Sequence, residues 1–239
     1  MKNIEKNFYI LTISKNDLKG LNKTIRAVNR IKTNFKLIHI VKIFNLNSET
    51  IETIESRNLK RIIINSYDSG IYNSMNTILE RVPNNEYAIF LNSGDIIKGE
   101  LDLNYFSTCK NFYLINTYKE KYFKRNLIKI KNTFFDGMPF SHQSLIFKKK
   151  FGMYFSEDYE ICGDYEFIIK WLKKYYKYPA EVDKIYKVKT IFDINGISSK
   201  RRLKRDFEGY KVILRSCGIF KSLIYLTNRF KSYLRILIY

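Results

Sequence analysis

The order of apolar runs up to residue 91 constrains the fold more than any other feature of this sequence. Short runs rich in β-branched and aromatic residues, at 8–14, 36–44, 60–65 and 86–91, are separated by longer stretches in which apolar residues recur at helical spacing. Strands and helices in such alternation build a parallel sheet with crossover helices. Right-handed crossovers place the loops after the strands at one sheet edge, where open α/β sheets bind ligands. We therefore expect an α/β fold with its site at that edge.

Helical stretches follow two of these runs. The first is expected to begin after Asn16 or Asp17, either of which is a good N-cap, and to bury Leu18, Leu21, Ile25 and Val28. The second is expected to end at Arg81 or Val82, because a proline follows at position 83. Beyond Asp95 the alternation weakens. There we expect a strand and a hairpin over 111–130, a helix over 163–176, and helical, basic sequence from Lys200 onward.

Composition and charge narrow the class of protein. Hydrophobic residues make up 45% of the 239 residues, which excludes a disordered chain. The 43 Lys and Arg residues outnumber the 23 Asp and Glu residues and give a net charge of +20, which favours nucleic acid, anionic membrane or phosphorylated small molecules as partners. Three widely spaced cysteines indicate a reducing cytoplasm rather than a disulfide framework or a zinc site. No uncharged apolar run approaches the roughly eighteen residues of a spanning helix.

Familiar phosphate-binding loops are missing from the sequence. It has neither GxGxxG after its first strand nor GxxxxGK[ST], which disfavours Rossmann dehydrogenases and P-loop NTPases. The fourth apolar run instead leads into Asn92-Ser93-Gly94-Asp95, which presents a carboxylate at the expected ligand edge. Such an oxygen ligand suits Mg²⁺ or Mn²⁺ bound together with substrate phosphates. Ser-Gly-Asp is equally good turn chemistry, so the motif alone does not decide.

A second motif, at residues 66–76, adds to the evidence from the motif at 92–95. Residues 66–76 read Ser-Tyr-Asp-Ser-Gly-Ile-Tyr-Asn-Ser-Met-Asn and precede the Phe-Leu-Asn-Ser-Gly-Asp of 90–95. Together they resemble the motifs of family 2 glycosyltransferases of the GT-A fold, especially the bacterial colanic-acid and O-antigen type. The resemblance continues in family order through 11–16, 138–144, 163–167 and 195–198. It covers residues 8–198, and it implies a GT-A fold, a mainly parallel sheet with flanking helices.

The resemblance also implies roles for individual residues. It places the nucleotide base and ribose near Thr12, Ser14 and Asp68, and the donor sugar and acceptor near His142 and Gln143. It places the diphosphate and a divalent metal at Asp95, with Ser93 in the place of the family's first acid. A further departure lies after the second strand, where Asn45 and Asn47 stand in place of the family's acids. These asparagines can hydrogen-bond a uracil edge but supply no charge.

Asp164 is the catalytic base that the resemblance implies. Sugar transfer with inversion needs a base that takes the proton from the acceptor hydroxyl as it attacks the anomeric carbon. An acid in the first turn of a helix is also favoured by the helix dipole alone, whatever its function. Asp158 and Glu160, in the preceding loop, are competing candidates for the base.

The carboxyl-terminal segment has the pattern of a basic amphipathic helix. One helical face carries the apolar residues Leu223, Leu226, Phe230, Leu234 and Leu237. Away from this face lie the cations Lys221, Arg229, Lys231 and Arg235, and no acid follows Glu208. This pattern suits an anionic membrane surface, and it suits equally a helix that docks on its own domain with a solvated basic face. We expect a GT-A domain at 1–199 and a basic helical arm at 200–239.

The predicted function is therefore transfer of a sugar, with inversion, from a nucleotide donor that we expect to be UDP-linked. Mn²⁺ or Mg²⁺ is the expected cofactor, and a lipid-linked saccharide in surface polysaccharide biosynthesis is the expected acceptor. The expected location is cytoplasmic, peripheral at the inner face of the membrane. Two alternatives stay open: a basic protein that binds nucleic acid through aromatic and lysine-rich patches, and a GT-A-like domain that binds without catalysis.

Overall fold

A computed structural model of the chain describes residues 6–44, 59–67, 70–121, 124–193 and 201–238. These residues belong to two compact units. The first unit comprises Met1–Ile128, Gln143–Tyr154 and Asp183–Ile194, and the second comprises Lys129–His142, Phe155–Val182 and Asn195–Tyr239.

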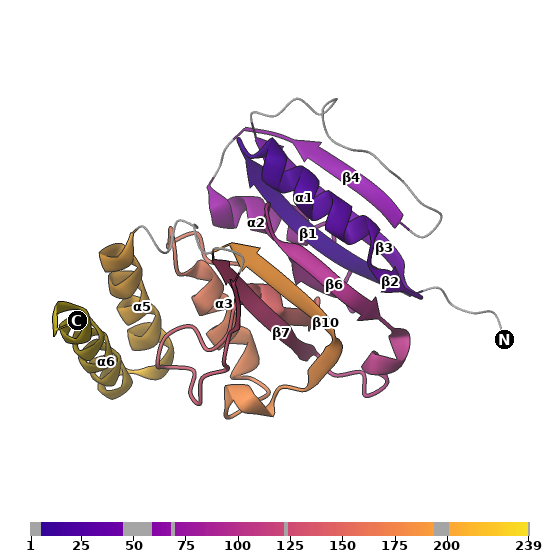
Figure 1. The fold of residues 1–239 in the computed structure, drawn as a ribbon. Helices are drawn as coiled ribbons and strands as arrows, with labels where there is room; N and C mark the ends of the chain where they lie inside the picture. The colour runs from indigo at the N-terminus through magenta and orange to yellow at the C-terminus, as the bar shows by residue number, and fades with distance from the viewer. Residues whose placement is uncertain (1–5, 45–58, 68–69, 122–123, 194–200, 239) are drawn as a thin grey trace. The chain divides into compact units, whose positions relative to one another are not determined.

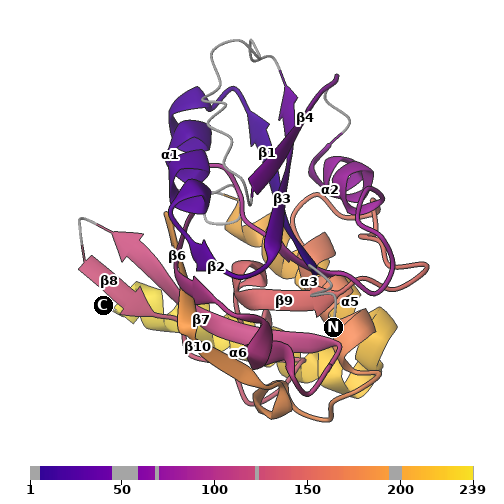
Figure 2. The same ribbon diagram turned by 90° about the vertical axis from the view of Figure 1, so that its right-hand side faces the viewer.

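A 10-stranded sheet forms the first unit (Figures 1 and 2). Its strands are β1 (Asn7–Lys15), β2 (Lys32–Thr33), β3 (Lys36–Phe44), β4 (Leu59–Asn65), β5 (Tyr87–Phe90), β6 (Ile96–Leu101), β7 (Phe112–Lys121), β8 (Lys124–Leu127), β9 (Leu145–Lys148) and β10 (Lys184–Asp193). They lie in the order β2-β6-β10-β7-β9-β5-β1-β3-β4, with β8 paired to β7. The pairs β3 with β4, β1 with β3 and β1 with β5 are parallel, whereas β9 is antiparallel to both β5 and β7.

Two helices of this unit connect the parallel strands, as the sequence predicted. Helix α1 (Leu18–Asn29) begins after Asp17, whose Oδ1 accepts a hydrogen bond of 2.9 Å from the Gly20 N–H. Helix α2 (Ile71–Leu79) ends a little earlier than expected. The N–H groups of Arg81 and Val82 still bond the carbonyls of Ile78 and Leu79, so the chain continues as a turn up to the proline.

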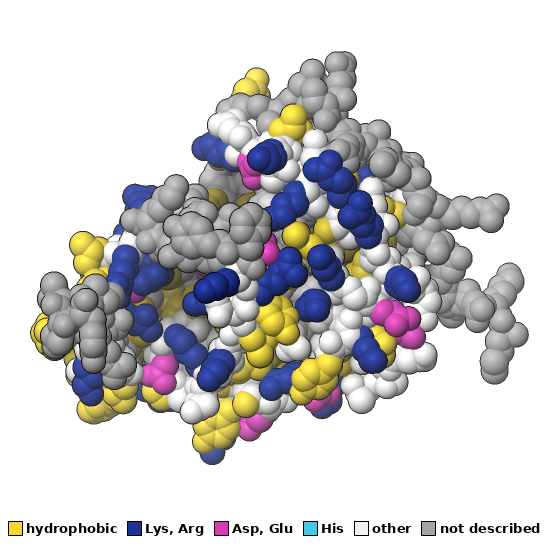
Figure 3. Space-filling view, in the orientation of Figure 1, with side chains coloured by type: hydrophobic (Ala, Val, Ile, Leu, Met, Phe, Trp, Pro, Cys, Tyr) yellow, Lys and Arg dark blue, Asp and Glu magenta, His cyan; other side chains and the backbone are white. Residues whose placement is uncertain are grey.

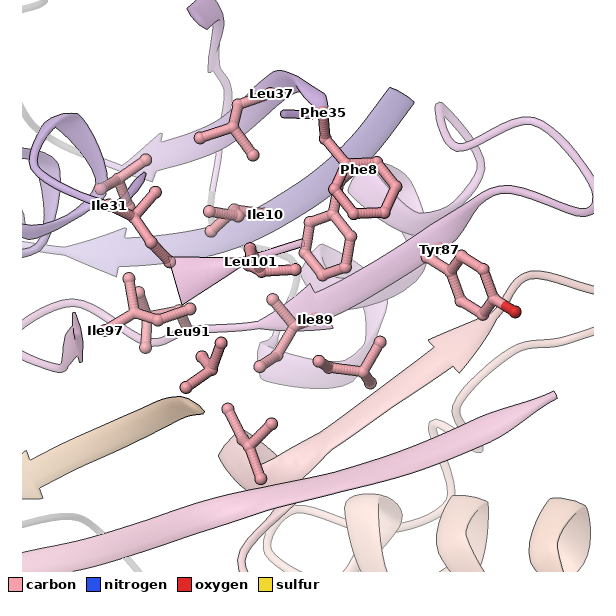
Figure 4. Packing of buried hydrophobic residues seen from close by; sticks show 14 of the residues in the cluster. Phe8, Ile10, Ile31, Phe35, Leu37, Tyr87, Ile89, Leu91, Ile97 and Leu101 are labelled. Carbon is pink, nitrogen blue, oxygen red and sulfur yellow. The ribbon is translucent and has the colours of Figure 1, made fainter. Parts of the chain in front are cut away.

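A core cluster of the first unit joins β1, β5 and β6 with the segment between α1 and β3. Phe8 and Ile10 of β1 and Ile89 of β5, with Leu91 just after it, converge with Phe35 and with Ile97 and Leu101 of β6, all nearly or fully buried (Figure 4). Phe106 packs edge-on against Phe35, with ring centroids 5.4 Å apart. Aromatic rings in this geometry add attraction to the burial of apolar area, so the aromatic content of the chain stabilises the sheet that carries the site.

The second unit is built from helices and loops. Helix α3 (Gly163–Leu172) is followed in the chain by α5 (Arg202–Cys217) and α6 (Ile219–Ile238), which lie side by side (Figure 1). Helix α3 ends four residues before the predicted end at 176, because the buried face closes with Trp171 and Leu172 and lysines follow. Gly218, with φ of 84°, separates α5 from α6, so the predicted basic segment is two helices. The predicted domain boundary at residue 199 stays a prediction.

Candidate functional site

Among the described residues, Thr12, Ser14, Ser93 and Asp95, which the sequence predicted on the donor side, lie around the ends of β1 and β5, in the first unit. Thr12 on β1 is fully buried, and its hydroxyl donates to the Leu91 carbonyl at 2.7 Å. Its Oγ1 also lies 3.0 Å from His39 Nε2. Because Arg61 Nε–H donates to His39 Nδ1 at 3.3 Å, Nε2 carries the ring proton and donates it to Thr12. Burial, and secondly the Arg61 charge, lowers the pKa of His39 to about 3. Thr12 thus braces the sheet behind the site.

Ser14 and Ser93 form a polar cluster with Asp17 at this edge. The Ser93 hydroxyl lies 2.9 Å from Asp17 Oδ2 and donates to it, and the Ser14 hydroxyl donates to the Asp17 carbonyl at 3.2 Å. A Cβ on Gly20 would overlap the Asp17 carboxylate, so glycine at that position makes room for it. The structure therefore brings an acid, Asp17, within hydrogen-bond distance of Ser93.

Asp95 holds its own turn together. Its side chain is 5% exposed, and Oδ2 accepts hydrogen bonds of 3.1 Å from the Asn92 N–H and from Gln143 Nε2. The turn passes through Gly94 at φ of 91°, a backbone conformation that favours glycine. Gln143 is itself fixed, because its carbonyl accepts a hydrogen bond from Thr190 of β10 at 3.1 Å. The structure thus brings Asp95 and Gln143 together at the predicted edge.

The edge of the sheet around Asp17, Ser93 and Asp95 offers few ligands for a metal ion. Within the residues that the structure describes, no three acidic, histidine or cysteine side chains gather as a metal site. Of the described residues at this edge, Asp95 and Asp17 contribute carboxylates. Mg²⁺ and Mn²⁺ are often held by one or two protein carboxylates, substrate phosphates and water. This donor set therefore suits such an ion only together with a diphosphate.

The second unit places the predicted base beside the predicted histidine. Asp164 lies in the first turn of α3, where its Oδ1 accepts the N–H of Tyr165 at 2.8 Å. Its Oδ2 is 3.0 Å from Nδ1 of His142, and the two side chains are 16% and 21% exposed. The partial exposure leaves the pair accessible to a small polar ligand, and the helix dipole favours a carboxylate at this position.

The competing acids are engaged with arginine and lysine residues. Asp158 Oδ2 accepts a hydrogen bond of 3.1 Å from Arg215. Glu160 pairs with Arg201 at 2.8 Å and with Lys204, and hydrogen bonds from these two cations lower the pKa of Glu160. A carboxylate with a lowered pKa is a weaker proton acceptor, which argues against Glu160 as a base.

The loop that leads to His142 is fixed at Asp136. Its carboxylate accepts hydrogen bonds of 2.9 Å from Thr133 and from Asn228 of α6. Its carbonyl accepts from Lys131 at 2.7 Å and from Arg229 at 2.8 Å. Burial, and secondly the Arg229 charge, lowers the pKa of Lys131 to about 8. Helix α6 is therefore attached to the loop through its Asn228 and Arg229.

Comparison with solved structures identifies the fold. The chain superimposes on residues 1–349 of TarS from S. aureus, in complex with UDP-GlcNAc, with a TM-score of 0.60 and 13% identity over 94% of this chain and 73% of that one. It also superimposes on the mannosyltransferase PcManGT from Pyrobaculum calidifontis, in complex with GDP-Man and Mn²⁺, with a TM-score of 0.60 and 10% identity over 93% and 68% of the two chains. The chain has a glycosyltransferase fold. No family model and no curated protein matches its sequence.

Within this glycosyltransferase fold some predicted site residues fall outside the described residues: Asp68, Asn45, Asn47 and the segment 195–198. Sequence reasoning missed the hydrogen bonds of two acids described above, Asp17 and Asp136. It took Asp17 only as a helix cap, because the contact with Ser93 joins residues 76 positions apart. It did not single out Asp136, because the partners of Asp136 in α6 lie 92 and 93 positions away.

Proposed function

We propose that this chain transfers a sugar, with inversion, from a UDP-linked donor to a saccharide acceptor. The observation that carries the proposal is the His142–Asp164 pair in a chain with a glycosyltransferase fold. The nucleotide sugars in the similar structures, UDP-GlcNAc in TarS and GDP-Man in the mannosyltransferase, support a nucleotide-sugar donor. The resemblance of residues 66–76 and 90–95 to family 2 supports the same reaction.

In this proposal Asp164 is the base. As the acceptor oxygen attacks the anomeric carbon, its proton passes to a carboxylate oxygen of Asp164, and the bond to the nucleoside diphosphate breaks on the opposite side. His142, at 3.0 Å, orients the carboxylate and binds the acceptor. A positioned base of this kind contributes about 10²- to 10⁴-fold to the rate.

The donor-side residues bind and orient the nucleotide sugar. Ser14, Ser93 and Asp68 are proposed to bind the nucleoside, and Thr12 supports them from behind. Asp95 and Gln143 are proposed at the diphosphate, where Asp95 would hold Mn²⁺ or Mg²⁺. Such an ion, when bound, neutralises the charge that develops on the diphosphate.

We propose that the protein binds its acceptor at the surface of an anionic membrane. The described part of α6 exposes Leu223, Leu226, Phe230 and Leu234 by 51%, 42%, 64% and 41%. Helix α6 packs on its own unit through a different face, where Ser222 and Tyr225 are buried. A helix with an apolar stripe beside cations binds at the surface of an anionic bilayer, so a lipid-linked saccharide at the inner face of the membrane, on the way to a surface polysaccharide, is the proposed acceptor. Among the described helices, none has the length and apolar character that crossing a bilayer requires.

Release of UDP tests the reaction. The chain is incubated with UDP-Gal, UDP-Glc, UDP-GlcNAc and UDP-GalNAc in the presence of Mn²⁺, with and without EDTA. Metal-dependent release of UDP supports the proposal, whereas binding of UDP without release supports a non-catalytic domain. Failure to bind any nucleotide sugar, with tight binding to RNA or DNA instead, would overturn the proposal.

Asp95→Asn tests the donor site. The amide retains the size of the side chain but supplies no charge to a metal ion, so calorimetry should show that Mn²⁺ no longer strengthens UDP binding. Asp102→Asn is the matched control, because Asp102 also accepts a backbone N–H, that of Asn104, but in an exposed turn. Equal Mn²⁺ dependence in both variants would remove Asp95 from the metal site.

A further inference from the structure

A buried carboxylate on α5 accepts hydrogen bonds from the backbone of the loop immediately before α3. Glu208 is 6% exposed, and its two oxygens accept the N–H groups of Glu160, Ile161 and Cys162 at 3.2, 2.8 and 3.0 Å. Backbone N–H groups at the beginning of a helix have no partner within the helix. Cys162 is the N-cap of α3, so Glu208 accepts the N–H groups of the N-cap residue and of the two residues before it, just ahead of the first turn of the helix.

The contact lies close to the proposed base. Cys162 is two positions before Asp164, and its thiol donates to the Arg205 carbonyl of α5 at 3.2 Å. Burial, and then the charges of Asp164 and Glu208, raise the pKa of the Cys162 thiol, so both carboxylates act on the same sulfur. The beginning of α3 is therefore attached to α5 on the side next to Asp164.

The attachment is stronger than a surface ion pair. Hydrogen bonds to a charged acceptor are roughly twice as strong as neutral ones, and here three converge on one buried carboxylate. The cation pairs of Glu160 and Asp158, by contrast, are largely exposed and contribute little. Removing Glu208 would leave the N–H groups of Ile161 and Cys162 buried without an acceptor, which favours movement of this loop.

We infer that Glu208 is a positioning residue for Asp164: it fixes the 160–162 loop and thereby sets where the carboxylate of Asp164 lies relative to His142. The inference rests on the proposed function, because it assigns Asp164 the role of base. By this inference α5 supports the proposed base through Glu208. A displacement of about 1 Å in a reacting group can cost about 100-fold in rate.

The experiment compares Glu208→Gln with the wild-type chain. The variant keeps the shape of the side chain but places an NH₂ group against the backbone N–H donors. We expect UDP release from the UDP-sugar that the wild type turns over to fall roughly 10- to 100-fold, with UDP binding within two-fold of wild type. Amide hydrogen exchange at Ile161 and Cys162 should become faster. Asp206→Asn is the matched control: it is a buried acid on the same helix, bonded to Arg205 and Tyr233 instead.

A double-mutant cycle separates positioning from a general loss of structure. If Glu208 acts through Asp164, Glu208→Gln should have no further effect on the rate in the Asp164→Asn background. Additive losses, or equal rates for Glu208→Gln and the wild type, would overturn the inference. A wild-type chain without turnover would overturn the proposed function and this role together. If Glu208→Gln does not fold, Glu208→Asp, which keeps the charge but shortens the side chain, is read in the same way.

Discussion

Acid should destabilise this protein through His39, one of its two histidines. Inside the sheet the pKa of His39 is lowered from 6.5 to about 3, first by burial and then by Arg61. Above pH 6.5 the ring is neutral in both the folded and unfolded states and contributes no pH dependence. Between pH 6.5 and 3 the unfolded chain binds a proton that the folded chain excludes, so the free energy of unfolding falls by about 1.4 kcal/mol per pH unit. At pH 4.5 the loss is about 3 kcal/mol, a large part of the 5–15 kcal/mol typical of a domain.

Urea unfolding between pH 7 and pH 4.5 measures this loss. Carboxylates titrate in the same range, so the useful quantity is the difference between the wild type and His39→Gln at each pH. The glutamine amide can donate to Thr12 Oγ1 and accept from Arg61, yet it has no proton to gain. We expect the wild type to lose stability more steeply than the variant, by about 3 kcal/mol between pH 7 and 4.5. Parallel curves for the wild type and His39→Gln would refute the reasoning, because the buried ring would then be taking up a proton without cost.

Two further predictions concern the proposed reaction and the membrane. Asp164→Asn should keep UDP binding by calorimetry but lower UDP release by about 10²- to 10⁴-fold, and Asp158→Asn should not; the reverse would move the base to Asp158. The double variant Leu223→Ser, Phe230→Ser should bind phosphatidylglycerol vesicles about 30-fold more weakly in a sedimentation assay, which corresponds to about 2 kcal/mol of lost apolar burial. The control Phe151→Ser changes a side chain of the first unit that is 90% exposed, and it should leave vesicle binding unchanged. Undiminished binding by the double variant would exclude α6 as the membrane surface.

The sequence predicted the sheet well where one signal dominates. The runs at 8–14, 36–44, 60–65 and 86–91 became β1, β3, β4 and β5 to within a residue at each end, and the hairpin expected in 111–130 is β7 with β8. The apolar spacing was sufficient there, because buried parallel strands are continuously apolar. Helix ends were less accurate, because the last turns of α2 and α3 depend on tertiary packing that spacing does not contain.

The candidate site was predicted by its residues but not by their contacts. His142 and Asp164 were each assigned a place by motif, and only the fold shows that they meet. Thr12 was expected near the nucleotide, yet its side chain is directed into the sheet. The contacts of Asp17, Asp136 and Glu208 were missed because their partners are distant in sequence, and no local pattern distinguishes an acid with such long-range hydrogen bonds from a surface acid.

The last acids of the chain explain how a strongly basic segment can pack on its own unit and still present the basic outer face that the proposed membrane binding requires. Asp206 and Glu208 are the final acids, and both are buried: one bonds Arg205 and Tyr233, and the other holds the loop before α3. Where α5 meets α6, Gly209 leaves the space that the Tyr225 hydroxyl occupies, which lets the two helices approach closely.

Because these acids point inward, the outer surface of the last two helices is left to cations and apolar side chains. The face of the molecule in Figure 3 likewise shows many Lys and Arg side chains and few acids. Lys221 and Lys231 have no acid on their own helix, since the chain contains none after Glu208. Truncating α6 would remove the bonds of Asn228 and Arg229 to Asp136 along with the apolar stripe. Point substitutions on the stripe are therefore the cleaner test, because they change the outer face of α6 and leave the inner face attached to the loop of His142.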